Sequence, residues 1–177
     1  MNRVFLFLPL AIFVVMGVYF ALGLREDPSS IPSRMIDRPL PAFDLAAIAE
    51  GEPGFSNADL DGQVALVNVF GTWCPPCEIE HPMLMQISRS GRVPIYGVDW
   101  RDEPGAGAAW LARNGNPYQR VGDDPDGDLA FELGITGAPE TFLIDRQGQV
   151  RFHHVGIIDE TVWRDTLLPM IEALETE

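Results

Sequence analysis

The chain has 177 residues, and 26 acidic against 12 basic side chains give it a formal net charge of −14 at pH 7. A surface this acidic argues against nucleic acid and anionic lipid headgroups as partners, because both are negatively charged themselves. Its two cysteines are too few for a structural framework of disulfides. After an apolar N-terminal segment, about 150 residues remain, which is enough for one domain with a hydrophobic core.

The N-terminal segment, residues 1–24, has the pattern of a membrane anchor. Its run Val4–Leu24 carries no charged side chain and has the length of about 20 apolar residues that one bilayer crossing needs. Arg3 precedes the run, so the positive-inside rule places the N-terminus in the cytoplasm and the rest of the chain outside it. Ala21 and Gly23 weakly match a signal-peptide cleavage site, which leaves removal of the segment as an alternative.

Residues 25–38 are rich in proline and serine and predict a linker, and residues 39–177 are expected to form one domain. Near-continuous apolar runs predict buried strands, and apolar residues four apart, such as Ile79, Met83 and Ile87, predict a helix. The order of elements predicts an α/β fold with a mixed central sheet and helices on both faces. We expect strands at 63–70, 94–98, 141–145 and 150–155, and helices at 75–89, 105–113, 128–133 and 159–174.

The motif Cys74-Pro75-Pro76-Cys77 holds both cysteines and lies where a predicted strand passes into a helix. Two cysteines at this spacing can alternate between dithiol and disulfide, which predicts a redox-active pair. Cys74 begins the helix, where unpaired N–H groups and the helix dipole lower the pKa of a thiol below its usual value of about 8.5. We therefore predict that Cys74 is the exposed nucleophile and that Cys77, one turn further along and shielded, is the resolving cysteine.

A structural zinc site is the other common use of such a pair, and the sequence argues against it. Zinc requires four ligands, but the chain has no second Cys-x-x-Cys motif, and His153 and His154 lie far from the first one in sequence. Glu78 follows Cys77, so the motif is not a haem-attachment site either. We expect neither a metal ion nor any other cofactor.

The segment Trp73–Cys77 resembles the active site of the thioredoxin superfamily. Pro82 matches the proline that kinks the active-site helix of that family, and Gly137–Phe142 is similar to its cis-proline loop. The resemblance implies a thioredoxin-like fold behind the N-terminal transmembrane helix. It also implies that the two cysteines form a redox-active disulfide.

The resemblance also implies which residues face the substrate. The bond between Ala138 and Pro139 is expected to be cis, and the Ala138 backbone to pair with an extended substrate beside Cys74. Trp73 is expected to present its ring to the substrate, and Glu140, which adjoins the same loop, is also expected to contact the substrate.

Further segments resemble the CcmG/DsbE family, which consists of membrane-anchored periplasmic thioredoxin-like proteins of c-type cytochrome maturation. The resemblance extends from Arg38 to Val155, and Pro76 departs from it because other members often carry threonine or valine there. The matching segments, in chain order, are Phe70–Pro75, Glu80–Pro82, Gly97–Asp102, Gly115–Tyr118 and Gly134–Thr141.

Acidic residues near the motif favour a reductant, because negative neighbours raise the pKa of a thiol. Thioredoxins usually carry a buried aspartate six residues before the first cysteine, as proton acceptor for the second. Here that position is Asn68, which cannot ionise. We therefore predict that Glu80, one turn beyond Cys77, accepts its proton. An exposed carboxylate without a role remains the alternative for Glu80 and for Glu140.

The resemblance implies that the protein reduces the haem-binding Cys-x-x-Cys-His disulfide of apocytochrome c, or a mixed disulfide held by another maturation factor. A transmembrane thiol relay of the CcdA or DsbD type would re-reduce the pair, since the periplasm is kept oxidising. The implied location is the bacterial inner membrane, with one crossing and the catalytic domain in the periplasm. A general periplasmic reductase or oxidase with other clients, and a non-catalytic module that binds apocytochrome, remain alternatives.

Overall fold

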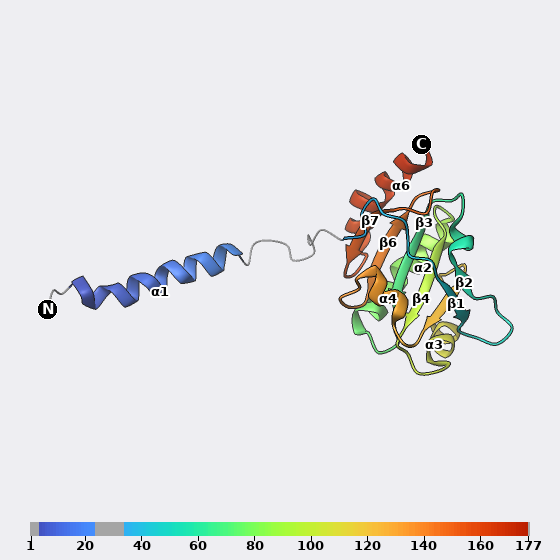
Figure 1. Cartoon of the computed structure of the whole chain (residues 1–177), viewed down its shortest axis with the longest axis horizontal. Helices are drawn as coiled ribbons and strands as arrows, with labels where there is room; N and C mark the ends of the chain where they lie inside the picture. The colour runs from blue at the N-terminus through green and yellow to red at the C-terminus, as the bar shows by residue number, and fades with distance from the viewer. Residues whose placement is uncertain (1–3, 24–33, 177) are drawn as a thin grey trace. The chain divides into compact units, whose positions relative to one another are not determined.

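The computed structural model describes residues 4–23 and 34–176, which belong to two separate compact units (Figure 1). The first unit contains helix α1 (Val4–Gly23), which has Pro9 inside it. In the described parts of the chain, no helix is found that has both the length and the apolar character for a bilayer crossing. The transmembrane helix predicted within residues 1–24 is therefore not shown, and most of the predicted linker lies outside the described residues.

A mixed sheet of seven strands forms the centre of the second unit: β1 (Asp44–Ala47), β2 (Phe55–Ser56), β3 (Ala65–Phe70), β4 (Ile95–Trp100), β5 (Val121–Asp124), β6 (Glu140–Ile144) and β7 (Val150–Val155). Their order across the sheet is β2-β1-β5-β4-β3-β6-β7 (Figure 1). Strands β3, β4 and β5 are parallel to one another, whereas β6 and β7 continue the sheet antiparallel on one side. The antiparallel hairpin β1–β2 extends the other side through β5.

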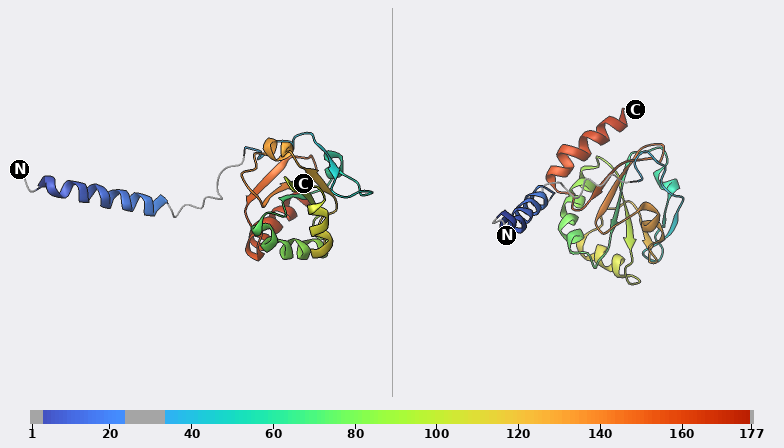
Figure 2. Two further views of the ribbon diagram at one scale, coloured as in Figure 1. Left: turned by 90° about the horizontal axis from the view of Figure 1, so that it is seen from below. Right: turned by 60° about the vertical axis from the view of Figure 1, so that its left-hand side comes forward.

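Helices cover both faces of this sheet, as Figure 2 shows in its left view. One hydrophobic cluster joins the sheet to α2, α3 and the C-terminal helical segment, through residues such as Leu84, Leu111 and Ile171. A second cluster on the opposite face includes Leu129 and Leu133 of α4 and Leu60 of the 3₁₀ turn η2. The predicted α/β class, with a mixed sheet and helices on both faces, is confirmed. The helical elements are η2 (Asn57–Leu60), α2 (Pro75–Ser90), α3 (Ala106–Asn114), α4 (Asp128–Leu133), α5 (Glu160–Val162), the π-helical η3 (Trp163–Leu167) and α6 (Leu168–Glu175).

The ordered contacts of the second unit begin before the predicted domain start at residue 39. The Asp37 N–H donates to the Val150 carbonyl at 2.8 Å, and the Arg38 carbonyl accepts the Val150 N–H at 2.9 Å. The last two residues assigned to the linker therefore pair with the first residue of β7.

Helix α2 carries the cysteine motif, and its buried side chains include charged and polar ones. Cys74 is its N-cap residue, with extended backbone, and the helix ends at Gly91 with φ of 64°, a left-handed conformation that suits glycine. Of the apolar residues that predicted the helix, Ile87 is buried, but Ile79 is 66% exposed. The buried positions are Cys77, Glu80, His81, Leu84 and Ile87, so they include a carboxylate.

Candidate active site

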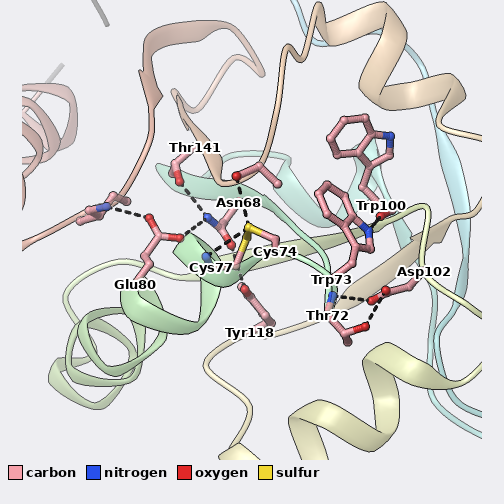
Figure 3. Close-up of a disulfide and its surroundings, with 12 residues drawn as sticks. Asn68, Thr72, Trp73, Cys74, Cys77, Glu80, Trp100, Asp102, Tyr118 and Thr141 are labelled. Carbon is pink, nitrogen blue, oxygen red and sulfur yellow. Dashed lines mark hydrogen bonds between the residues drawn. A yellow bond between two sulfur atoms is a disulfide. The ribbon is translucent and has the colours of Figure 1, made fainter.

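The two cysteines form a disulfide at the N-terminus of α2, with their Cα atoms 5.3 Å apart (Figure 3). Strand β3 ends at Phe70, and the short turn that follows brings Cys74 to the N-cap position of the helix. The Cys74 sulfur accepts a hydrogen bond from the Cys77 N–H at 3.1 Å. A thiolate at this sulfur would keep that N–H and the positive end of the helix dipole, as the sequence predicts for a nucleophile.

Exposure does not distinguish the two cysteines in the disulfide form. Cys74 is 3% exposed and Cys77 is 5% exposed, whereas the prediction that Cys74 is the exposed thiol concerns the reduced pair and stays a prediction. The low exposure of Cys74 is due to the disulfide itself together with the Ala138 loop, whose carbonyl oxygen lies 3.2 Å from the Cys74 sulfur. The assignment of Cys74 as nucleophile rests on its place at the helix start and stays a prediction.

Trp73 lies half exposed beside the disulfide, with 49% of its surface accessible. Its indole N–H donates to the Trp100 carbonyl at 3.0 Å, and the two indole rings meet edge to face at 5.5 Å. Gly71 leaves room for this ring, because a Cβ at that position would come within 2.6 Å of the Trp73 indole nitrogen. The Trp73 ring is thus held at the surface, where a substrate can contact it.

Asp102 holds the turn before the cysteines in place, a role that the sequence analysis did not predict. Its carboxylate accepts hydrogen bonds from the Thr72 N–H at 2.8 Å and the Thr72 hydroxyl at 2.7 Å. The two residues are 30 positions apart in the chain, so no local pattern connects them.

The loop that precedes β6 lies against the disulfide from a distant part of the chain. The Ala138–Pro139 peptide bond is cis. The Pro139 carbonyl accepts a hydrogen bond from the Gly156 N–H at 2.9 Å, which ties the loop to the end of β7.

Glu140 does not lie where a substrate could contact it, which corrects its predicted role. Its side chain is fully buried, and one carboxylate oxygen accepts hydrogen bonds from the Thr136 N–H, the Thr136 hydroxyl and the Gly137 N–H at 2.7–3.0 Å. The other oxygen lies 2.6 Å from His153 Nε2. Burial raises the pKa of Glu140, but hydrogen bonds from His153 and Thr136 outweigh it and lower the pKa below its usual value.

Glu80 is also buried, only 1% exposed, so the alternative of an exposed helix carboxylate is wrong. One of its oxygens accepts the Ile158 N–H at 2.8 Å, and the other accepts the Asn68 side-chain amide at 3.1 Å. Burial raises the pKa of Glu80 from 4.5 to about 7, although these two hydrogen bonds oppose the shift. A carboxyl group with such a pKa can take and release a proton near neutral pH.

Asn68 connects Glu80 to a wider buried network (Figure 3). Its amide nitrogen also donates to the Thr141 hydroxyl at 2.9 Å, and its oxygen accepts the Tyr118 hydroxyl at 2.8 Å. Burial, with the negative charges of Glu80 and Asp99, raises the pKa of Tyr118 well above its usual value. Tyr118 therefore acts as a hydrogen-bond donor inside the domain.

Two further residues, which belong to the segments that resemble the CcmG/DsbE family, lie inside the domain. Asp99 is 3% exposed, and burial, together with the hydrogen bond and charge of Asp102, raises its pKa to about 8. His81 is also buried, its Nε2 lies 3.3 Å from the Asn114 carbonyl, and its ring meets Trp110 edge to face. Neither side chain reaches the surface beside the disulfide, so both support the fold around the site.

A cysteine pair at the start of a helix after a central parallel strand, beside a cis-proline loop and one helical turn before a buried acid, defines a thioredoxin-like thiol:disulfide oxidoreductase. The chain belongs to the redoxin family, whose model matches residues 36–167, and its relatives are DsbE-type thiol:disulfide interchange proteins.

Two of these relatives match along the whole chain. The thiol:disulfide interchange protein DsbE of Pseudomonas aeruginosa is 46% identical, with 100% of this chain and 98% of that protein covered. The protein of the same name from Escherichia coli is 37% identical over the same shares of the two chains.

Solved structures agree with this family. A putative DsbE from Chlorobium tepidum superposes with a TM-score of 0.63 at 26% identity, covering 77% of this chain and 95% of that one. A putative thioredoxin from Neisseria meningitidis superposes with a TM-score of 0.66 at 25% identity, covering 78% and 90%.

Proposed function

We propose that this thiol:disulfide oxidoreductase acts as a reductant in cytochrome c maturation. Its substrate would be the disulfide in the haem-binding Cys-x-x-Cys-His site of apocytochrome c, or a mixed disulfide with a maturation partner. The observation that carries the proposal is the Cys74–Cys77 disulfide at the start of α2, close to the buried acid Glu80. The DsbE-type relatives and the sequence resemblance support the choice of pathway.

The reaction proceeds in two exchanges. The Cys74 thiolate attacks one sulfur of the substrate disulfide, which forms a mixed disulfide and releases the other substrate sulfur as a thiolate. Cys77 then loses its proton to Glu80 and attacks the Cys74 sulfur, which releases the second substrate thiolate. The substrate gains two electrons, and the two cysteines are left as a disulfide. One released thiolate takes the proton that Glu80 accepted from Cys77, and the other takes a proton from solvent.

Glu80 also favours the reducing direction. An ionised carboxylate close to the cysteines disfavours their thiolate forms, and a less stable dithiol gives its electrons away more readily. The oxidised pair then requires electrons from across the membrane, for which we propose a transmembrane thiol relay of the CcdA or DsbD type.

We further propose that α1 anchors the domain in the inner membrane, with the catalytic unit in the periplasm. The uncharged sequence Val4–Leu24 supports an anchor, as do the large apolar side chains that α1 exposes, Phe13 at 73% and Tyr19 at 75% among them. An anchored reductase would meet membrane-bound partners at a higher effective concentration.

The reduction potential tests the direction of electron flow. The full chain, purified in detergent, is equilibrated with glutathione buffers, and the fraction of Cys74–Cys77 disulfide is measured by thiol alkylation and mass spectrometry. A reductant requires a value more negative than about −180 mV, whereas a value near about −120 mV, as in a strong periplasmic oxidant, would contradict the proposal. The variant with both cysteines replaced by serine separates catalysis from binding, because a non-catalytic module would still support cytochrome c assembly.

A further inference from the structure

His153 lies behind the cis-proline loop and outside the site described above. It belongs to β7, opposite Phe142 of β6 in the sheet register, and its ring stacks on the Phe142 ring with centroids 4.1 Å apart. The His153 side chain is 7% exposed, and its Nε2 lies 2.6 Å from an oxygen of Glu140. The imidazole therefore has one fixed position and one fixed partner.

Glu140 connects His153 to the loop, because its carboxylate contacts both. A buried carboxylate is stable only when its oxygens are satisfied by donors, and here all the donors come from two places. Thr136 and Gly137 bind one oxygen through three hydrogen bonds, and His153 binds the other. Without His153, one side of a fully buried carboxylate would lose its partner, and the carboxylate would shift or take up a proton.

The same loop places Ala138 beside the Cys74 sulfur. The Ala138 carbonyl oxygen lies 3.2 Å from the Cys74 sulfur, so any peptide bound in a mixed disulfide at Cys74 must lie beside this segment of backbone. We infer that His153 is a positioning residue, which acts through Glu140 to set the loop that receives a peptide substrate at Cys74. This inference rests on the proposed disulfide reduction and adds a determinant of its reactivity toward peptides.

The neighbouring histidine provides a matched control. His154 follows on the same strand, pairs with Thr141 in the register, and its Nε2 lies 3.1 Å from the Ile157 carbonyl rather than from the loop. Both rings are partly buried, so the same substitution at the two positions removes comparable volume and polarity.

The test compares two substrates across three variants of the full chain in detergent. One substrate is an oxidised peptide with the Cys-x-x-Cys-His sequence, and the other is 2-hydroxyethyl disulfide, which is too small to run along the loop. His153→Phe keeps a ring for the stack on Phe142 but deletes the donor to Glu140. His153→Gln restores a donor, and His154→Phe is the control.

We expect His153→Phe to lower the rate constant for the peptide about tenfold, the cost of one hydrogen bond to a charged group. The rate with the small disulfide should stay within a factor of about two, because it needs only the cysteines. His153→Gln should recover most of the peptide rate, and His154→Phe should leave both rates unchanged.

Equal losses with both substrates, or a peptide rate that His153→Phe leaves intact, would overturn the inference. Thr136→Val, which removes only the hydroxyl donor to Glu140, gives the same test with a smaller loss if His153→Phe does not fold. If the unmodified chain reduces neither substrate, the proposed function itself fails. If the unmodified chain reduces both substrates but His153→Phe and His154→Phe change the two rates in the same way, only the role of His153 fails.

Discussion

Asn68 is the residue that most changes the chemistry expected from a thioredoxin-like site. Its side chain uses both amide hydrogens and its oxygen, donating to Glu80 and Thr141 and accepting from Tyr118. A neutral amide at this position can orient its neighbours but cannot take up a proton. We therefore propose that Glu80, whose pKa of about 7 is set mainly by burial, has the acid–base role.

The raised pKa of Glu80 predicts a specific pH dependence of stability. Because the folded-state pKa of about 7 exceeds the ordinary value of 4.5, the protonated carboxyl favours the folded state, and this contribution is lost as the pH rises from 4.5 through 7. Glu80→Gln stays neutral. The difference in unfolding free energy between this variant and the wild type should therefore shift by about 3 kcal/mol in favour of the variant as the pH rises from acidic to alkaline. The size follows because each pKa unit corresponds to about 1.4 kcal/mol.

Urea unfolding of the oxidised full chain in detergent, repeated across this pH range, measures that difference. Glu78→Gln is the matched control, because Glu78 lies on the same helix and is exposed. A difference between Glu80→Gln and the wild type that does not change with pH would show that the pKa of Glu80 is the same in the folded and unfolded states. That result would contradict the raised pKa that suits Glu80 to exchange a proton with Cys77.

At the scale of elements, strong apolar periodicity was enough to predict most of the fold. The predicted strands and helices lie within two residues of the observed ends, and the strand–turn–helix that carries the cysteines is among them. The hairpin β1–β2 and strand β5 were missed because they are short, with four residues or fewer in each strand. Strand β5 reads Val-Gly-Asp-Asp, and only its pairing with β4 and β1 makes it a strand.

The residues of the site also differ in whether a local sequence pattern predicts them. Local sequence motifs predict the cysteines and the loop around Pro139. Asp102 and His153 act through partners 30 and 13 residues away, which no local pattern reveals. The burial of Glu140 was equally hidden, because a glutamate beside a loop proline is usually a surface residue and only tertiary contacts supply its donors.

The whole molecule consists of a catalytic unit and a proposed anchor. The catalytic unit contains both hydrophobic clusters and all seven strands of the sheet. We therefore expect a fragment that begins at Arg25 to fold alone and to reduce disulfides at the rate of the full chain. Exported without α1 at equal abundance, it should support less cytochrome c maturation, because the effective concentration near membrane partners is lost.

Protease treatment of intact spheroplasts examines the proposed topology of the full chain. Digestion of the catalytic unit is expected, with a cytoplasmic marker protein left intact as the control. Protection until the cells are lysed would contradict both the periplasmic location and the partners proposed there.

The order of attack by the two cysteines is the central claim, and trapping of the mixed disulfide tests it most directly. Reduced Cys77→Ser and Cys74→Ser chains are each mixed with an oxidised Cys-x-x-Cys-His peptide, and the adducts are mapped by mass spectrometry. The account predicts a stable adduct on Cys74 in Cys77→Ser and little or none in Cys74→Ser. An adduct that forms on Cys77 at an equal or greater rate would contradict the assignment of Cys74 as the nucleophile.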